Sequence, residues 1–221
     1  MAKDKKSALL AGATGLVGNQ LLQLLLQNDT YHTIWVPGRR APEVKDDRVK
    51  FIACDFSDFS AFPKEGATEV FCTLGTTIKK AGSQEKFRAV DFEAVVNLAR
   101  WAAQTGTAHF VVVSSIGAQP KARNFYLRTK GQMEQVLKTC GLQNLSIVRP
   151  ALLLGTRSEF RLGEKLGEWL MQPLRFLLVG PLKKYRPIKA AQVARAMLHL
   201  AQNRIGDTFI VENQELHTTG N

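Results

Sequence analysis

Ala8-Leu-Leu-Ala-Gly12-Ala-Thr-Gly15-Leu-Val-Gly18 joins a short apolar run to the helix-like stretch from Asn19 to Leu26. Glycines between a strand and a helix allow a tight turn and let the backbone approach a pyrophosphate, which then lies against the amides and the positive end of the helix dipole. A turn whose glycines serve packing alone is the alternative. The stretch predicts a phosphate-binding turn made by Gly12, Thr14, Gly15, Leu16 and Val17.

Strand-like and helix-like segments alternate along the chain. The β-rich runs are Ala8–Ala13, Thr33–Val36, Val49–Ala53, Glu69–Thr73, His109–Ser114 and Leu145–Val148, and the helix-like stretches are Gly15–Gln27, Gln84–Gln104, Tyr126–Thr139 and Ala190–Gln202, the last of which closes the chain. Several strands are apolar on successive residues, which suits strands covered on both faces. The pattern predicts an α/β fold with a doubly wound parallel sheet, the Rossmann fold. With no linker or repeat in 221 residues, we expect a single domain over 1–221.

Composition excludes several classes of protein. The three cysteines, Cys54, Cys72 and Cys140, lack zinc or disulfide spacing, the four histidines form no cluster, and no metal site is expected. The formal net charge of +11 is spread without basic runs or interleaved aromatic residues, so nucleic acid is not expected as a partner. No apolar run is long enough to span a membrane, and the start of the chain does not resemble a signal peptide, so a cytoplasmic location is expected.

Two arginines follow the second strand, in Thr33-Ile-Trp-Val-Pro-Gly-Arg39-Arg40. NAD-preferring folds place a carboxylate here for the ribose 2′-hydroxyl, and that carboxylate would repel a 2′-phosphate. Guanidinium groups hold such a phosphate through charge-assisted hydrogen bonds. Arg39 and Arg40 therefore predict NADP(H) as the cofactor, with solvent-exposed arginines in a turn as the alternative.

A serine pair and a Tyr-x-x-x-Lys pattern follow the fifth strand. Residues four apart share a helix face, so the ammonium of Lys130 lies beside the phenol of Tyr126 and favours its phenolate. Tyr126 is then the predicted proton donor, and Ser115 the hydrogen-bond donor to the reacting oxygen. Ser114 remains open as an alternative, because neighbouring strand residues point in opposite directions.

In this order and spacing, the motifs resemble an atypical short-chain dehydrogenase/reductase. Phe71–Thr77, Ser114–Ala118, Asn124–Tyr126, Lys130-Gly131, Arg149-Pro150 and Arg161–Glu164 are similar to the Tat-interacting oxidoreductase branch and its bacterial relatives. The resemblance implies that Asp55 meets the adenine amine, although a turn role fits it nearly as well, and that Leu74, Gly75, Tyr126, Lys130, Leu153 and Arg161 contact the cofactor. Asp91 stands where many relatives have Asn, which places any proton relay through that residue in question.

The family places a variable substrate cap near residues 156–190, where Trp169, Met171 and Phe176 line an apolar pocket or pack as an ordinary amphipathic helix. The resemblance implies an NADP(H)-dependent oxidoreductase acting on a small carbonyl or alcohol. The alternative is an NADP(H)-binding regulator or redox sensor without turnover. An epimerase or dehydratase with tightly held NAD is a third interpretation, disfavoured because the chain is short for a C-terminal nucleotide-sugar domain.

Overall fold

The structure is a computed structural model that describes residues 5–155, 180–203, 206 and 208–220. Its strands are β1 (Lys6–Ala11), β2 (Tyr31–Gly38), β3 (Val49–Ala53), β4 (Glu69–Cys72), β5 (His109–Val113), β6 (Leu145–Arg149), β7 (Leu153–Leu154), β8 (Ile188–Lys189) and β9 (Thr208–Glu212). Seven of them form one sheet in the order β3-β2-β1-β4-β5-β6-β9, and every pair in it is parallel. Strands β7 and β8 form a separate parallel pair. The predicted doubly wound Rossmann fold is confirmed.

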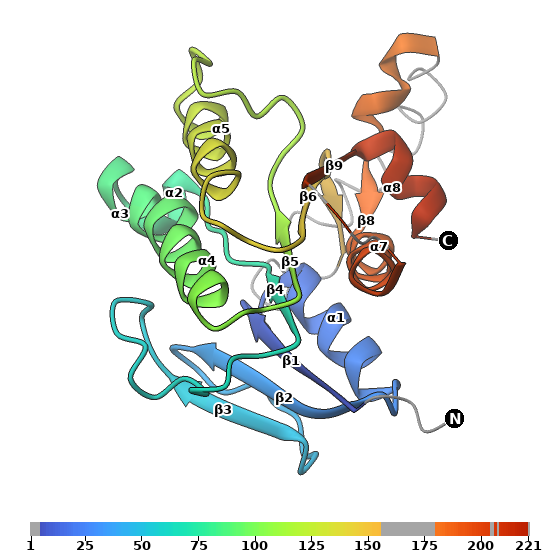
Figure 1. Cartoon of the computed structure of the whole chain (residues 1–221). Coiled ribbons are helices and arrows are strands. Elements are labelled where there is room, and N and C mark those ends of the chain that lie inside the picture. Colours follow the sequence, from blue (N-terminus) through green and yellow to red (C-terminus); the bar gives the residue numbers. More distant parts are fainter. Residues whose placement is uncertain (1–4, 156–179, 204–205, 207, 221) are drawn as a thin grey trace.

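Helices cover both faces of this sheet (Figure 1). They are α1 (Leu16–Leu26), α2 (Ile78–Ala81), α3 (Gln84–Arg88), α4 (Ala94–Gln104), α5 (Phe125–Leu137), α7 (Ala190–Asn203) and α8 (Asn213–Thr219), with a π-helical segment η1 (Ala89–Glu93) between α3 and α4 and a 3-10 segment η2 (Gly180–Tyr185). Helices α1, α7 and α8 pack on one face, and α4 and α5 pack on the other.

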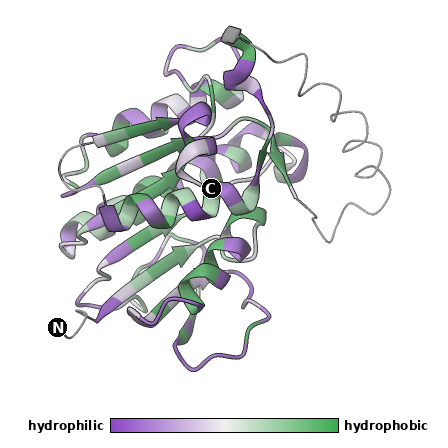
Figure 2. Cartoon of the chain, turned by 90° about the vertical axis from the view of Figure 1, so that its right-hand side faces the viewer, coloured by the Kyte–Doolittle hydropathy of each residue, from purple (hydrophilic) through white to green (hydrophobic). Residues whose placement is uncertain are grey.

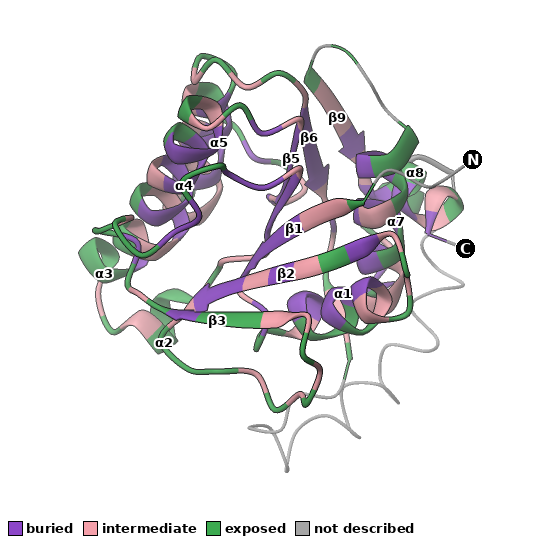
Figure 3. Ribbon diagram, turned by 60° about the horizontal axis from the view of Figure 1, so that its bottom comes forward, coloured by how far each residue is buried: buried purple, intermediate pink, exposed green. Residues whose placement is uncertain are grey.

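Alternation along the strands divides the core in two. Ala8 and Leu10 of β1 face α1 and α7, whereas Leu9 and Ala11 face α4, and all four are fully buried. Hydrophobic residues run along the strands, with hydrophilic residues on loops and outer helix turns (Figure 2). The central strands are buried, while the edge strand β3 is largely accessible to solvent (Figure 3). A strand buried on both faces explains the continuous apolar runs in the sequence.

Several predicted boundaries were wrong. The first strand ends at Ala11, because Gly12 takes a left-handed φ of 87° and turns the chain. The helix from Ala190 does not close the chain: β9 and α8 follow it, and β9 adds a seventh strand at the edge of the sheet. The stretch predicted as one helix over 84–104 is helical throughout but contains η1.

Candidate active site

The carboxyl ends of parallel strands meet at one edge of a sheet, so the segments after β1 to β6 gather there (Figure 1). The order of strands reverses between β1 and β4. At this switch point the Thr73 Oγ1 hydroxyl after β4 donates a 2.9 Å hydrogen bond to the carbonyl of Ala11 in β1. Open α/β sheets bind ligands in the crevice at such a point.

The glycine turn after β1 is shaped for close approach. A Cβ atom at Gly12 would lie 2.7 Å from Thr73 Oγ1, and one at Gly18 would lie 2.1 Å from the Gly12 carbonyl oxygen. Gly15 is exposed, and a Cβ there would meet only that same oxygen, at 3.1 Å. Gly15 is also the N-cap of α1, which has no side-chain cap and no acidic residue in its first turn. These open helix amides fit a phosphate group.

Arg39 and Arg40 are exposed in the turn after β2. Within the described residues, neither guanidinium forms a hydrogen bond or an ion pair. Asp55, after β3, takes the turn role that the sequence left open: its carboxylate accepts hydrogen bonds from the Ser57 amide at 3.0 Å and the Ser57 hydroxyl at 2.6 Å. These bonds from Ser57 lower the pKa of Asp55.

The segment after β4 brings the predicted ribose and pyrophosphate contacts next to α5. Leu74 packs against the core on the α4 side. Gly75 is exposed, and a Cβ built there would lie 3.5 Å from Asp91 Oδ1 and 4.0 Å from Lys130 Nζ. Gly75 therefore leaves an open approach to the buried ammonium of Lys130.

The two serines after β5 have different surroundings. Ser114 is 4% exposed, and its hydroxyl donates a 2.5 Å hydrogen bond to the buried carboxylate of Glu134 in α5. Ser115 is half-buried, and its hydroxyl makes only a 3.4 Å contact with the carbonyl of Ile116. The Ser115 hydroxyl is thus the one available to a substrate.

Helix α5 carries the Tyr-x-x-x-Lys pair and begins where Asn124 Oδ1 accepts a hydrogen bond from the Leu127 amide. Tyr126 is half-buried, with its ring 5.6 Å from that of Phe87 in α3. Lys130 is buried, one turn further along. A Cβ at Gly131 would lie 2.1 Å from the backbone of Gln119, so this glycine lets the loop that follows Ser115 pack directly on α5.

Lys130 forms an ion pair with Asp91 of η1, with 2.8 Å between Nζ and Oδ1. Burial by itself lowers the pKa of Lys130, but the attraction of Asp91 and then of Tyr126 outweighs it, and the net pKa of Lys130 is raised. Lys130 is therefore a fixed cation. The sequence marked Asp91 only as a departure from Asn, whereas the structure places it in contact with the predicted catalytic lysine.

A second charged group, missed by the sequence analysis, joins the ends of β6 and β9 to helix α5 and the loop after β5. Arg149 of β6 binds both carboxylate oxygens of Glu134, at 2.9 and 2.5 Å, and its Nη1 lies 2.8 Å from Glu212 of β9. It also donates to the Ala118 carbonyl at 3.3 Å. The Arg149-Pro150 motif was the only sequence signal, because Glu134 and Glu212 lie far from it in the chain.

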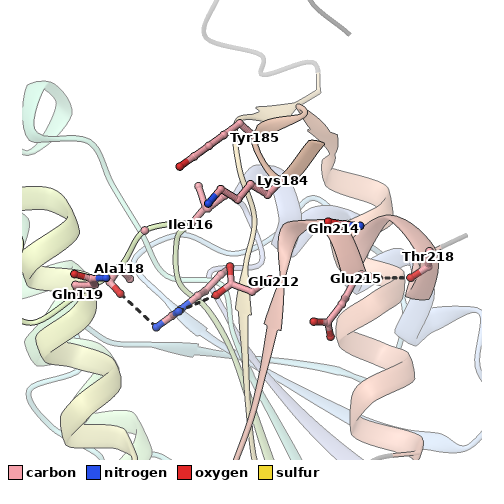
Figure 4. A pocket seen from close by; sticks show the side chains of 11 residues that line it. Ile116, Ala118, Gln119, Lys184, Tyr185, Glu212, Gln214, Glu215 and Thr218 are labelled. Carbon is pink, nitrogen blue, oxygen red and sulfur yellow. Dashed lines mark hydrogen bonds and ion pairs between the residues drawn. The ribbon is translucent and has the colours of Figure 1, made fainter. Parts of the chain in front are cut away.

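Arg149 is one of the residues that line a pocket of about 830 Å³, which Figure 4 shows from close by. Ile116 to Gln119 form one side, Lys184 and Tyr185 of η2 lie across from them, and Gln214, Glu215 and Thr218 project from α8. Neither Tyr126 nor Lys130 lines it, so the pocket adjoins the loop after Ser115 but is separate from the Tyr-x-x-x-Lys pair.

The segment after β6 returns to the phosphate-binding turn. Leu153 and Leu16 are half-buried and pack against the same core, and a Cβ at Gly155 would lie 2.7 Å from Leu16 Cδ1. Arg161 and the predicted cap residues Trp169, Met171 and Phe176 lie outside the described residues.

Two general properties concern only the described residues. No helix among them is both long enough and apolar enough to cross a membrane. In the same part of the chain, no group of three or more histidine, cysteine, aspartate or glutamate residues is placed to hold a metal ion.

The sheet order, the uncapped α1 at the switch point and the open glycine turn define a Rossmann dinucleotide-binding protein. Residues 12–204 match the family model described as NAD(P)H-binding. The chain belongs to this NAD(P)H-binding family, as an atypical short-chain dehydrogenase/reductase related to HTATIP2.

Two relatives are similar over nearly their whole length. The mitochondrial protein FMP52 of Debaryomyces hansenii is 30% identical, with 93% of each chain covered. Protein HTATIP2 of Rattus norvegicus is also 30% identical, over 96% of this chain and 88% of its own. A fold match to Helicobacter pylori ADP-L-glycero-D-manno-heptose-6-epimerase has a TM-score of 0.70 and 14% identity, covering 95% of this chain and 76% of the epimerase. At that identity it supports the fold alone.

Proposed function

We propose that this protein is an NADP(H)-dependent oxidoreductase that interconverts a small carbonyl compound and its alcohol. The observation that carries the proposal is the grouping of a buried, cationic Lys130, a half-buried Tyr126 one turn before it, and an available Ser115 hydroxyl on the loop that packs on the same helix. A proton donor, a cation beside it and a second hydroxyl are what carbonyl reduction requires of the protein.

Each residue has a separate role in the reductive direction. Bound NADPH supplies the hydride that reduces the carbonyl carbon. The Tyr126 hydroxyl gives its proton to the carbonyl oxygen and is reprotonated from solvent, while Ser115 donates a hydrogen bond to the same oxygen as negative charge develops on it. Lys130 stabilises the phenolate left on Tyr126 and hydrogen-bonds the nicotinamide ribose.

The preference for NADP(H) rests on Arg39 and Arg40, whose guanidinium groups have no partner among the described residues. Gly12, Thr14, Gly15, Leu16 and Val17 hold the pyrophosphate, and Leu74, Gly75 and Leu153 line the crevice beyond it. Asp55 is proposed to meet the adenine amine as well, because the two hydrogen bonds from Ser57 both reach Oδ1 of its carboxylate.

The proposal is tested by titrating purified protein with NADPH and then following NADPH consumption across a panel of small aldehydes and ketones. Tyr126→Phe removes only the hydroxyl, so NADPH affinity is expected to stay near the parental value while the reductase rate falls by roughly 10²–10⁴-fold. Parental turnover by Tyr126→Phe would overturn the assignment of Tyr126.

A regulator that binds NADP(H) without turnover is the second candidate. The ion pair favours it, because Asp91 offsets the positive charge that Lys130 offers to a phenolate. Tight NADPH binding without turnover of any carbonyl in the panel would select this candidate.

We also propose a cytosolic location. The relative FMP52 of Debaryomyces hansenii is described as mitochondrial, so the two locations are to be distinguished by imaging a fluorescent fusion.

A further inference from the structure

Asp91 lies in the one π-helical segment of the described chain, between α3 and α4. A π-helical turn inserts a residue into a helix and often marks a functional position. Here it carries a carboxylate that is 1% exposed. Its Oδ1 lies 2.8 Å from Lys130 Nζ, and its Oδ2 accepts a 2.8 Å hydrogen bond from the Thr76 amide. One side chain therefore joins η1, the loop after β4 and helix α5.

The position requires two acceptors. Both carboxylate oxygens of Asp91 face donors, the ammonium of Lys130 and the backbone N–H of Thr76. An asparagine here would turn its own N–H donors toward one of the two, whichever way its amide is oriented. These contacts explain why the residue is an aspartate. A neutral amide of the same shape would leave one of its N–H groups facing either the Lys130 ammonium or the Thr76 N–H.

The charges around Lys130 come from three elements. Asp91 faces it from η1, Tyr126 from the same helix α5, and the Cys72 thiol from the end of β4. Burial raises the pKa of Cys72 to about 12, so this thiol is neutral at ordinary pH. Asp91 is therefore the fixed negative charge beside the ammonium. Among the described residues it is also the only ion-pair partner of that ammonium, which has N–H donors to offer a ribose hydroxyl.

We propose that Asp91 is a positioning residue that holds Lys130 against the loop after β4 and offsets part of its positive charge, and thereby weakens the attraction of Lys130 for negative charge on Tyr126. The consequence for catalysis rests on the proposed function, whereas the electrostatic effect on Tyr126 does not. Lys130 attracts a phenolate on Tyr126, and the Asp91 carboxylate paired with Lys130 weakens that attraction. Neutralising Asp91 is therefore expected to favour the phenolate.

The test follows the ultraviolet difference absorption of tyrosinate against pH in cofactor-free protein. The chain has three tyrosines, so each variant is also made with Tyr126→Phe, and the difference between the two curves isolates Tyr126. At a given pH, Asp91→Asn and Asp91→Ser are expected to contain roughly tenfold more Tyr126 phenolate than the parent. The matched control is Glu93→Gln, which removes an exposed carboxylate from the same π-helical segment and should superimpose on the parent.

Folded Asp91 variants that titrate like the parent would overturn the inference. Should Asp91→Asn fail to fold, Asp91→Ser decides. Unfolding of both neutral variants, with Asp91→Glu folded, would make the role purely structural and would also overturn it. If the Tyr126 titration curve shifts but no carbonyl is turned over, only the proposed function is contradicted. If a substrate is found, the pH–rate profile of the Asp91 variants should shift together with the Tyr126 titration curve.

Discussion

The three glycines of the turn after β1 are required for different physical reasons. Gly12 needs its left-handed φ and its contact with Thr73, and Gly18 lies against the Gly12 carbonyl. Both are therefore fixed by the fold itself. Gly15 has an ordinary φ of −80° and mostly open space above it. The fold therefore does not require glycine at this position, and the proposed function assigns its small size to the pyrophosphate that would lie against the turn.

Gly15→Ala and Gly18→Ala should separate cofactor binding from folding. The Cβ of Gly15→Ala occupies the approach to the α1 amides, so NADPH affinity should fall about tenfold or more while the unfolding free energy changes by less than about 1 kcal/mol. Gly18→Ala forces a 2.1 Å contact with backbone and should lower the unfolding free energy by about 2 kcal/mol or more. Calorimetric titration with NADPH and urea denaturation measure the two effects. Undiminished binding by Gly15→Ala would place the phosphates elsewhere.

Replacing both Arg39 and Arg40 with alanine tests the choice between NADP(H) and NAD(H). Charge-assisted bonds to a phosphate contribute about 1.5–3 kcal/mol, so NADPH affinity should fall roughly 10- to 100-fold, with little change for NADH. Lys45→Asp, an exposed cation in the same connection, removes the same net charge and controls for long-range attraction. Equal losses for both cofactors would contradict the assignment.

At the scale of elements, the site depends on contacts between segments far apart in sequence. Spacing alone predicted Ser115, Tyr126 and Lys130 as site residues, because the motif lies on one loop and one helix. Asp91 and Glu134 act through partners in other elements, and spacing cannot show such contacts. Strand β9 escaped prediction because the helix before it was taken as the end of the chain. Strands β7 and β8, of two residues each, are too short for any periodicity to show.

Glu134→Gln should destabilise the junction of β5, β6 and α5. Glu134 is 3% exposed and binds Arg149 and Ser114, so removing its charge leaves a partly buried guanidinium with poorer compensation. We expect the unfolding free energy to fall by about 2–4 kcal/mol. Glu212, the second partner of Arg149, is 42% exposed, so Glu212→Gln should cost less than about 1 kcal/mol. Chemical denaturation of the two variants measures the difference, and equal losses would refute this ranking.

At the scale of the whole molecule, the parallel sheet separates the site from other polar groups. The functional loops follow the carboxyl ends of the strands, whereas a buried network lies at the opposite edge. There Lys6 pairs with Glu69 at 2.7 Å, Tyr31 donates to the same carboxylate, and His109 Nε2 lies 2.9 Å from Ser146 Oγ. The sequence predicted motifs directly after several parallel strands, and the carboxyl ends of parallel strands meet at one edge of a sheet. It did not reveal this network, whose members meet only through strand pairing.

His109 makes stability dependent on pH without touching the site. Burial, foremost, lowers its pKa from 6.5 to about 4, a hydrogen bond to the backbone of Ala201 opposes that shift, and the nearby Lys6 charge adds to it. Because the unfolded chain takes up the proton at higher pH than the folded chain, the contribution is complete above pH 6.5 and is lost as the pH falls toward 4. The loss amounts to about 3 kcal/mol at most.

We therefore expect His109→Gln, whose amide can still face Ser146, to flatten the dependence of unfolding free energy on pH between about pH 7 and pH 4.5. The slope is compared rather than the absolute stability, since the substitution also changes packing. His32→Gln alters an exposed histidine and should leave the parental slope intact. Urea denaturation at a series of pH values gives the slopes. If His109→Gln keeps the parental slope, the acid sensitivity arises from carboxylates instead. NADPH affinity at neutral pH should be unchanged in both variants, because His109 lies at the edge of the sheet opposite the glycine turn.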